Sequence, residues 1–516
     1  MIRTCVLLLL LVLAVSAAQA DPNIAGQKPW NFVFLLIDDY GWTDASCFGS
    51  DLYETPNVDR LAREGMKFDN AYSACTVCSP TRAASMTGKY PARLHVTDWI
   101  SGHVRAYAKL KIPEWTQYLA LEETTLAEAL KPSGYFTAHI GKWHLGDEGR
   151  WPCDQGFDVN VAGNQWGAPA TYYWPYESRG RGMPNLEMND ENQGKYLTDR
   201  LGDEAVKLLR AHADKPFYLN LPTYQVHTPI QPKKEYVPKY EAKLKAGLKH
   251  TNPEYAAMVQ SMDELVGKVL RTLDELKLAD RTVVFFTGDN GGLSHIYGNK
   301  RGPTDNSPLR LGKGSAYEGG VRVPLIVRWP GVAKAGSVCH EPVITVDYYP
   351  TMLEIAGAKG DAKHNATVDG TSLVPVLKNP DVQLDREAIY WHYPHYHPGG
   401  ATPYGAIRAR EWKLIEFYED NHVELYNLKD DVGEQQDLAA KMPEKANQLR
   451  AKLHAWRKAV GAQMPTANPD YDAQKDREAV QSRGAAKPVA KVKPGSKPKP
   501  KLQPKPAVKL EPKPVL

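Results

Sequence analysis

The chain has 516 residues and a formal charge of +4, but residues 487–516 hold nine lysines and one glutamate, so residues 1–486 carry a net charge of −4. This balance gives no basis for nucleic-acid binding by the body of the protein, because such binding depends on basic side chains that neutralise phosphates. Six cysteines are far too few to hold so long a chain as a disulfide scaffold, so we expect a hydrophobic core divided into two or three domains.

Residues 1–20 have the pattern of a secretory signal peptide. Arg3 supplies the positive start, residues 6–15 form an apolar run, and Ala18-Gln19-Ala20 matches a cleavage site of small residues. The alternative is an uncleaved membrane anchor, but the run is short for a helix that spans a bilayer. We therefore expect export, to the periplasm or the extracellular space.

A continuous apolar run over residues 31–37 predicts a strand buried on both faces of a parallel sheet. It ends at Asp38 and Asp39, and the carboxyl ends of strands are where open α/β sheets bind ligands. Adjacent carboxylates repel each other unless a cation lies between them. A pair of solvated turn aspartates is the alternative interpretation.

The segment Cys78-Ser79-Pro80-Thr81-Arg82 predicts the start of a helix, with Ser79 as its N-cap and Pro80 in the first turn. Cys78 then lies at the positive end of the helix, and Arg82 lies one turn further on the same face. A reactive group beside a fixed cation suits attack on an anionic ester. A structural cysteine, or a redox pair of Cys78 with Cys75, is the alternative.

Three further predicted strands end in polar residues. Residues 135–140 lead to Lys142 and His144, residues 217–221 precede His227, and residues 282–287 lead to Asp289 and Asn290. Together with Asp38 and Asp39, the last pair offers only oxygen ligands, which suit Ca²⁺ or Mg²⁺ rather than zinc.

Glycines in residues 311–324 let the backbone approach an anion, and Lys313 would add positive charge there. Glu318 and Arg322 are predicted to form an internal ion pair.

The pattern changes near residues 379–385. Short predicted strands at 407–408, 412–415 and 423–426, followed by an amphipathic helix over 438–460, predict a small α+β domain with an antiparallel sheet.

An aromatic and histidine cluster at 391–397 contains His395 and Tyr396, which are predicted to line the pocket rim and stack on a sugar. Ordinary interdomain packing is the alternative. Trp143, Trp166 and Trp174 are further candidates for stacking.

Residues 466–516, rich in lysine and proline towards the end, are predicted to be a disordered tail. An anionic cell envelope or polysaccharide is a candidate partner for this tail, and a plain solubilising role is the alternative.

These motifs resemble the sulfatase family. The resemblance is carried by the C-x-P-x-R pattern at Cys78, by Gly-Lys-Trp-His-Leu-Gly at 141–146 and by the glycine-rich segment, and it runs from about residue 30 to 462. It implies an α/β fold like that of alkaline phosphatase, with a large mixed, mostly parallel sheet flanked by helices and a small α+β C-terminal domain. The implied boundaries are 24–378 for the catalytic domain and 379–465 for the C-terminal domain.

The resemblance also implies roles for the site residues. Cys78 would be converted to Cα-formylglycine by a formylglycine-generating enzyme, and one calcium ion, or magnesium, would be bound. The implied metal ligands are Asp38, Asp39, Asp289, Asn290 and the modified Cys78. The implied catalytic residues are Cys78, Arg82, Lys142 and Lys313 around the sulfate, His144 beside the hydrated aldehyde and His227 as acid to the leaving oxygen.

The function implied is that of an exported sulfatase, a hydrolase of sulfate monoesters that acts on aryl sulfates in vitro and on sulfated carbohydrate in nature. One alternative is a formylglycine-dependent phosphonate or phosphodiester hydrolase. The other is an unmodified, non-catalytic glycan-binding protein.

Overall fold

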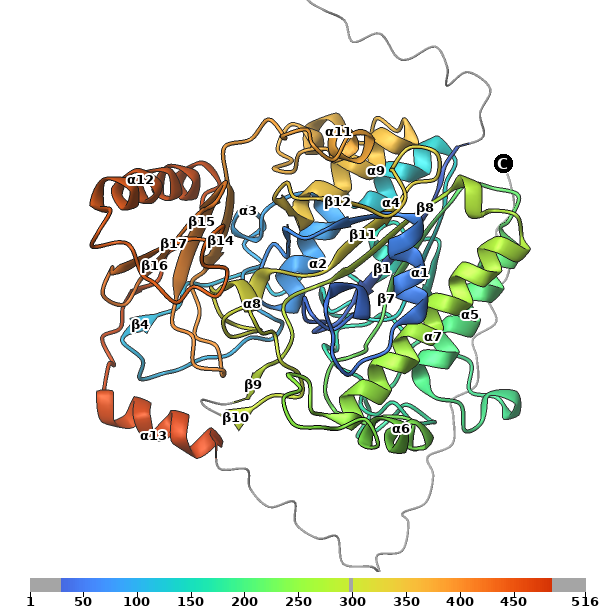
Figure 1. Ribbon diagram of the computed structural model, residues 1–516, viewed down its shortest axis with the longest axis horizontal. Coiled ribbons are helices and arrows are strands. Elements are labelled where there is room, and N and C mark those ends of the chain that lie inside the picture. Colours follow the sequence, from blue (N-terminus) through green and yellow to red (C-terminus); the bar gives the residue numbers. More distant parts are fainter. Residues whose placement is uncertain (1–28, 297–299, 485–516) are drawn as a thin grey trace, which may run out of the picture.

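The computed structural model describes residues 29–296 and 300–484. In this part of the chain the main sheet has eight strands in the order β12-β2-β11-β8-β1-β7-β5-β6 (Figure 1). Their bounds are β1 Asn31–Ile37, β2 Met66–Phe68, β5 Phe136–Ile140, β6 Val159–Val161, β7 Phe217–Pro222, β8 Thr282–Gly288, β11 Leu325–Arg328 and β12 Ser337–Cys339.

The four central strands β8, β1, β7 and β5 run parallel to one another, whereas β11 is antiparallel to both β8 and β2. In the β1–β8 register Ile37 pairs with Gly288, so these two strands end side by side. The sheet is therefore mixed and mostly parallel, as the sequence predicts, and the polar residues that follow the central strands share one edge.

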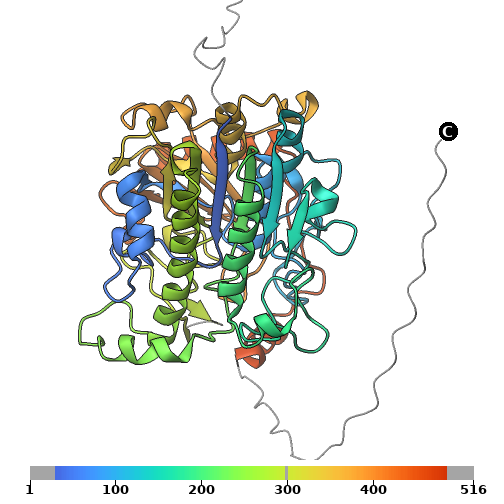
Figure 2. The same cartoon turned by 90° about the vertical axis from the view of Figure 1, so that its right-hand side faces the viewer.

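Alternate residues of β1 pack into two separate cores. Val33 and Leu35 join a cluster that includes residues of α1, α5 and α7, and Phe32 and Phe34 join a cluster that includes residues of α2, α4 and α9. Figure 2 shows α5 and α7 running side by side along the sheet. Helices on both faces explain why the strand reads as a continuous apolar run. The helices of this part are α1 Pro56–Glu64, α2 Cys78–Thr87, α3 Pro91–Leu94, α4 Leu126–Leu130, α5 Leu197–Ala211, α6 Val237–Glu241, α7 Pro253–Glu275, α8 Glu318–Val321, α9 Tyr348–Ala356, α10 Ala362–Asn365 and α11 Val374–Lys378.

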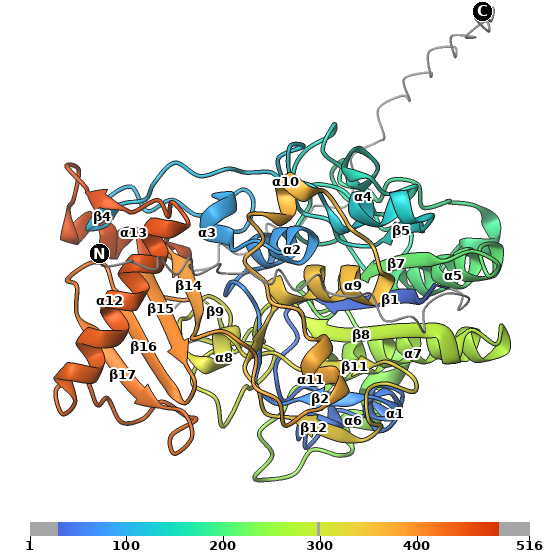
Figure 3. The same ribbon diagram turned by 90° about the horizontal axis from the view of Figure 1, so that it is seen from above.

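A second, antiparallel sheet is formed by β14 Ile389–Tyr393, β15 Tyr404–Ala409, β16 Trp412–Phe417 and β17 Val423–Asn427. Helix α12 (Pro443–Ala459) lies against this sheet (Figure 3) and is shorter than the predicted span 438–460. Leu449 and Leu453 of the helix and Leu414 of the sheet form one small core. The predicted α+β architecture of the C-terminal part is confirmed.

Residues 466–484 differ from the predicted disordered tail. Strand β18 (Thr466–Ala467) pairs with β4 (Leu110–Lys111), and helix α13 (Ala473–Gly484) follows it. Asp476 of this helix forms an ion pair with Arg105. The prediction extended the lysine and proline composition of residues 487–516 too far towards the N-terminus, and those residues lie outside the described part. The remaining short strands are β3 Ala71–Tyr72, β9 His295–Ile296, β10 Lys300–Arg301 and β13 Val343–Ile344.

No described helix combines the length and the apolar character needed to cross a bilayer. The predicted signal peptide lies outside the described residues, so export stays a prediction.

Candidate active site

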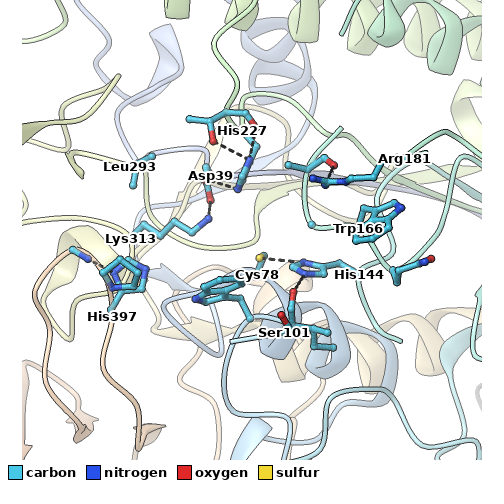
Figure 4. A pocket seen from close by; sticks show the side chains of 18 of the residues that line it. Asp39, Cys78, Ser101, His144, Trp166, Arg181, His227, Leu293, Lys313 and His397 are labelled. Atoms are coloured by element: carbon cyan, nitrogen blue, oxygen red, sulfur yellow. Dashed lines mark hydrogen bonds and ion pairs between the residues drawn. The ribbon is translucent and has the colours of Figure 1, made fainter. Parts of the chain in front are cut away.

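The ends of four neighbouring strands bring the predicted site residues together. Asp38 and Asp39 follow β1, Asp289 and Asn290 follow β8, and the loops after β5 and β7 supply the remaining side chains. Those side chains are Lys142 and His144 after β5 and His227 after β7. Figure 4 shows Cys78, His144, His227, Asp39 and Lys313 around a common space.

Cys78 is the first residue of α2, and its thiol borders the pocket. All residues of this helix are buried, so the backbone around Cys78 is fixed by packing. The predicted capping role of Ser79 is wrong, because the helix begins two residues earlier than expected, with Val77 at the N-cap. The Ser79 hydroxyl instead accepts a hydrogen bond from the backbone N–H of Ile100 at 3.1 Å.

Arg82 ties the helix to the acidic end of the sheet. Its Nε and Nη2 donate to Asp289 Oδ2 at 3.0 and 2.7 Å, and its Nη1 donates to the Lys142 carbonyl at 3.0 Å. Arg82 is 3% exposed and Asp289 is fully buried. Burial alone would raise the pKa of Asp289, but Arg82, Lys142 and Lys313 together outweigh it and hold that pKa below its usual value.

The two adjacent aspartates have different cationic partners. Lys142 Nζ lies 2.9 and 2.8 Å from the two oxygens of Asp38, and Lys313 Nζ lies 2.5 Å from Asp39 Oδ1. Burial raises the pKa of Asp38 well above its ordinary value, and nearby Asp289 adds to the effect. Burial would also raise the pKa of Asp39, but Lys313 and His227 outweigh it and lower that pKa.

This cluster has the oxygen ligands of a hard-cation site, and some of these oxygens have no other partner. Asp39 Oδ2 and Asn290 Oδ1 are buried and accept no hydrogen bond from any described residue. Oxygens of Asp38 and Asp39 and a nitrogen of His227 lie within 4.8 Å of one another. Three buried carboxylates and the Asn290 amide, with one unsatisfied oxygen on Asp39 and one on Asn290, fit Ca²⁺ or Mg²⁺, which take oxygen ligands. The residues present therefore fit the metal that the resemblance implies.

His144 lies between Cys78 and the loop that contains Ile100. Its Nδ1 lies 3.4 Å from the Cys78 thiol, and its Nε2 contacts the carbonyl oxygen of Ile100. A carbonyl only accepts, so Nε2 carries the proton and Nδ1 faces residue 78 as an acceptor. Gly167 packs against the other side of the ring, where a Cβ would come within 2.4 Å of Cε1. Burial lowers the pKa of His144 well below its usual value, which keeps the ring neutral.

His227 faces the same space from the β7 side. Its Nδ1 donates to the Thr228 carbonyl at 2.7 Å, which leaves Nε2 directed at Asp39 Oδ2, 3.6 Å away. Burial lowers the pKa of His227 to about 3. Lys313 lies opposite, on the glycine-rich segment, and the predicted ion pair of Glu318 with Arg322 is present there at 3.4 Å.

These groups open into a pocket of about 530 Å³. Its floor carries Cys78, His144, Asp39, His227 and Lys313, while Arg82 and Lys142 are buried beneath. The walls come from the loop residues Trp99, Ser101, Gln165, Trp166, Arg181 and His397 and from His295 of β9. These residues match no motif, and apart from the stacking candidate Trp166 and the cluster member His397 the sequence carries no local signal for them.

The structure does not place His395 and Tyr396 at the pocket rim. Both are 0% exposed. His395 Nε2 bonds to the Thr97 hydroxyl at 2.8 Å, and the Tyr396 hydroxyl donates to Glu419 at 2.7 Å. The run from 391 to 397 packs most of its side chains inward, and of the predicted cluster it is His397 that lines the pocket. The packing alternative therefore describes His395 and Tyr396 better than sugar stacking does.

The three candidate tryptophans have different surroundings. Trp166 lines the catalytic pocket, and Trp174 lines a second pocket beside it. Trp143 is 2% exposed, and its Nε1 donates to the Arg150 carbonyl at 2.8 Å. Trp143 is therefore a core residue.

Family models match this chain over most of the described part. The sulfatase model matches residues 30–358, and a model of the C-terminal region of N-sulphoglucosamine sulphohydrolase matches residues 311–459. A sulfatase of Formosa agariphila is 35% identical, over 87% of this chain and 92% of its own. The human N-acetylgalactosamine-6-sulfatase is 34% identical, over 70% of this chain and 68% of its own.

Solved structures agree with this assignment. The crystal structure of Ps i-CgsB in complex with k-i-k-neocarrahexaose has a TM-score of 0.69 and 27% identity, and it covers 88% of this chain and 98% of its own. The phosphonate monoester hydrolase of Agrobacterium radiobacter shares the fold, with a TM-score of 0.61, 20% identity and coverage of 84% and 96%. The chain belongs to the sulfatase family and is a sulfuric ester hydrolase.

Proposed function

We propose that this protein hydrolyses sulfate esters of carbohydrates, using a formylglycine made from Cys78 and a bound calcium ion. The observation that carries the proposal is the position of Cys78, at a helix start, with His144 Nδ1 3.4 Å from its side chain and Lys313 in the same pocket. The names of relatives that act on N-acetylgalactosamine 6-sulfate support a sugar substrate and guide the choice of a first one.

Each implied group has a limited and definable chemical part. In the aldehyde form, residue 78 would supply a hydrate hydroxyl as nucleophile and release sulfate on return to the aldehyde. Calcium held by Asp38, Asp39, Asp289 and Asn290 would offset charge on the sulfate oxygens. Magnesium fits the same ligands, and a comparison of the two ions decides between them.

The residues of the chain itself orient the sulfate ester and protonate its leaving oxygen. Lys313 points into the pocket beside Cys78 and stabilises negative charge on the ester. His144 Nδ1 accepts a hydrogen bond from the group at residue 78. Nε2 of His227 faces the pocket, and an anionic ester bound there favours its protonated form, which can give a proton to the leaving oxygen. Arg82 and Lys142 fix the carboxylates beneath.

The test is mass spectrometry of the peptide that contains Cys78, after expression with and without a formylglycine-generating enzyme. We expect an aldehyde at residue 78 only with that enzyme, together with turnover of an aryl sulfate. The matched control is Cys75→Ser, a buried neighbour outside the pocket, which should keep activity. Cys78→Ala should abolish it.

The same preparation separates the other functions. Faster turnover of an aryl phosphonate than of an aryl sulfate would indicate a phosphonate hydrolase. An unmodified thiol under all conditions, without turnover, would overturn the proposal and leave a glycan-binding protein. Removal of metal with a chelator should abolish turnover, and calcium should restore more of it than magnesium. Export is proposed on the predicted signal peptide and is tested by fractionating cells that express the full chain.

A further inference from the structure

The catalytic pocket continues into a second depression of about 520 Å³. The two pockets share Gln165 and Trp166 in their linings, so they adjoin at these residues. The second one is further lined by the aromatic and sulfur-containing side chains of Trp151, Trp174, Met183 and Met188 and by the polar residues Asn164 and Glu177. Aromatic faces suit carbohydrate rings, and the combined space is larger than one sulfated sugar requires.

Arg181 lies at the junction of the two pockets. Its side chain lines the catalytic pocket, while its neighbours Gly180 and Gly182 line the second one. The guanidinium lies 4.5 Å over the Trp166 ring, which holds it in place, and its Nη2 donates to the Ala168 carbonyl at 3.1 Å.

Arg181 differs from the other cations of the site in its partners. Arg82, Lys142 and Lys313 each contact a carboxylate of the predicted metal cluster. Among the described residues, Arg181 has no carboxylate partner, and its Nε donates no hydrogen bond there. Of the five N–H donors of this guanidinium, the Nε donor is buried and one on Nη2 is bonded to Ala168, so the donors left for a ligand are chiefly those on Nη1.

Arg181 lies on a different side of the pocket from the cation that faces the reacting group, Lys313 (Figure 4). Figure 4 shows Arg181 and Trp166 beyond His144, on the side of the pocket away from Lys313 and His397. A sulfate ester next to Cys78 and Lys313 is held by the groups on the floor of the site. A group that reaches Arg181 at the same time must therefore be a different part of the substrate.

We propose that Arg181 binds a second acidic group of the saccharide, a carboxylate or a second sulfate, next to the sulfate ester that is hydrolysed. This inference rests on the proposed function for the identity of the first group. Arginine recognises carboxylate and sulfate oxygens through paired N–H donors, so either source fits. The rest of the saccharide extends past Trp166 into the second pocket.

The experiment compares the Arg181→Gln protein with wild type, both carrying formylglycine, on four probes. The probes are an aryl sulfate, 6-O-sulfated N-acetylgalactosamine, the same sugar linked to a uronic acid, and its disulfated form. For a probe with a second acidic group, which is the uronate-linked or the disulfated sugar, we expect Arg181→Gln to lower kcat/KM relative to that of the aryl sulfate by at least tenfold. The loss should come from a higher KM. Arg179→Gln is the matched control, because Arg179 is an exposed arginine of the same loop outside both pockets, and it should leave the ratios unchanged.

A loss confined to the uronate probe identifies a carboxylate as the ligand, and a loss confined to the disulfated probe identifies a sulfate. Equal effects of Arg181→Gln on all four probes would overturn the inference. Calorimetric titration of the uronate and disulfated probes into Cys78→Ala protein gives a readout without turnover. If Arg181→Gln in that background does not weaken binding of either probe, the inference fails, whereas absent turnover with tenfold weaker binding counts only against the proposed function.

Discussion

Asp98 is a buried carboxyl beside the loop that holds His144. Its Oδ1 accepts from the Tyr393 hydroxyl at 2.8 Å and from the backbone N–H of Trp99 at 2.9 Å, and Trp99 directly precedes Ile100, whose carbonyl contacts His144. Burial raises the pKa of Asp98 from 3.8 to about 8. The folded protein therefore keeps a proton that the unfolded chain releases, so this contribution to stability is present below about pH 4 and is lost as the pH rises through about 8.

Asp98→Asn removes that titration. We expect its free energy of unfolding, measured by denaturant at several pH values between 4 and 8, to fall less with rising pH than that of wild type. Asp190→Asn, at an exposed position, is the control and should follow wild type. Identical slopes for Asp98→Asn and wild type would show that the Asp98 carboxyl does not hold a proton in the fold.

Lys313 should contribute to every sulfate ester alike, because its ammonium group faces the reacting centre rather than the rest of the substrate. We expect Lys313→Met to lower kcat/KM by about 10²–10³ on the aryl sulfate and on sulfated sugars, the usual loss when one charge-stabilising donor is removed. The measurement is steady-state kinetics on the same probes as for Arg181. A loss that depends strongly on the probe would assign Lys313 to substrate recognition instead.

At the scale of elements, strand β18 and helix α13 hold the segment 105–111. Asn468 Nδ2 donates to the carbonyls of Ala106 and Ala108 at 2.9 and 2.7 Å, and Asp476 forms an ion pair with Arg105. This segment follows the pocket loop that contains Trp99 and Ser101. Residues 466–484 therefore form a clamp, in the sense that their contacts hold the segment 105–111 in place next to one wall of the site.

Truncation tests this clamp. A chain ending at residue 465 should lose amide hydrogen-exchange protection in 105–111 and bind sulfated disaccharides more weakly, whereas a chain ending at 484 should match the full chain. Because exchange protection reports local opening, a difference confined to 105–111 separates the clamp from a general loss of stability. Equal protection in the two truncated chains would contradict it.

The sequence can predict those elements whose local residue pattern also determines where they lie in the fold. The strands β1 and β8 are continuous apolar runs, and their polar ends are placed by the parallel sheet itself, so the sequence alone is enough to bring Asp38 and Asp289 together. Arg181 comes from an irregular loop whose path is set by packing, and no local pattern marks it. The prediction for His395 is wrong because a run of aromatic residues in the sequence is equally compatible with a segment that faces a ligand and with one that packs into a core.

At the scale of the whole molecule, one buried ion cluster joins the C-terminal sheet to the glycine-rich segment of the catalytic part. Lys413 of β16 lies 2.9 Å from Glu318 and 3.0 Å from Glu434, and all three side chains are 0% exposed. Glu318 begins α8, in the same glycine-rich segment that carries Lys313. A core cluster that includes Tyr72 and Trp391 also spans both parts. The C-terminal sheet therefore supports the catalytic segment directly.

Lys413→Met should leave the buried carboxylate of Glu434 without its cation and Glu318 with Arg322 alone, at a cost of about 3–5 kcal/mol of folding stability. Because the cluster links the C-terminal sheet to the catalytic segment, tertiary fluorescence and sulfatase activity should be lost together, in one denaturant transition at a lower midpoint than in wild type. Adding Glu434→Gln should recover part of the stability, since it removes the stranded charge, while Lys429→Met, at an exposed position, is the matched control. Loss of activity well before loss of the fluorescence signal would mean that the two parts unfold separately and that Lys413 positions the catalytic segment without joining the folds.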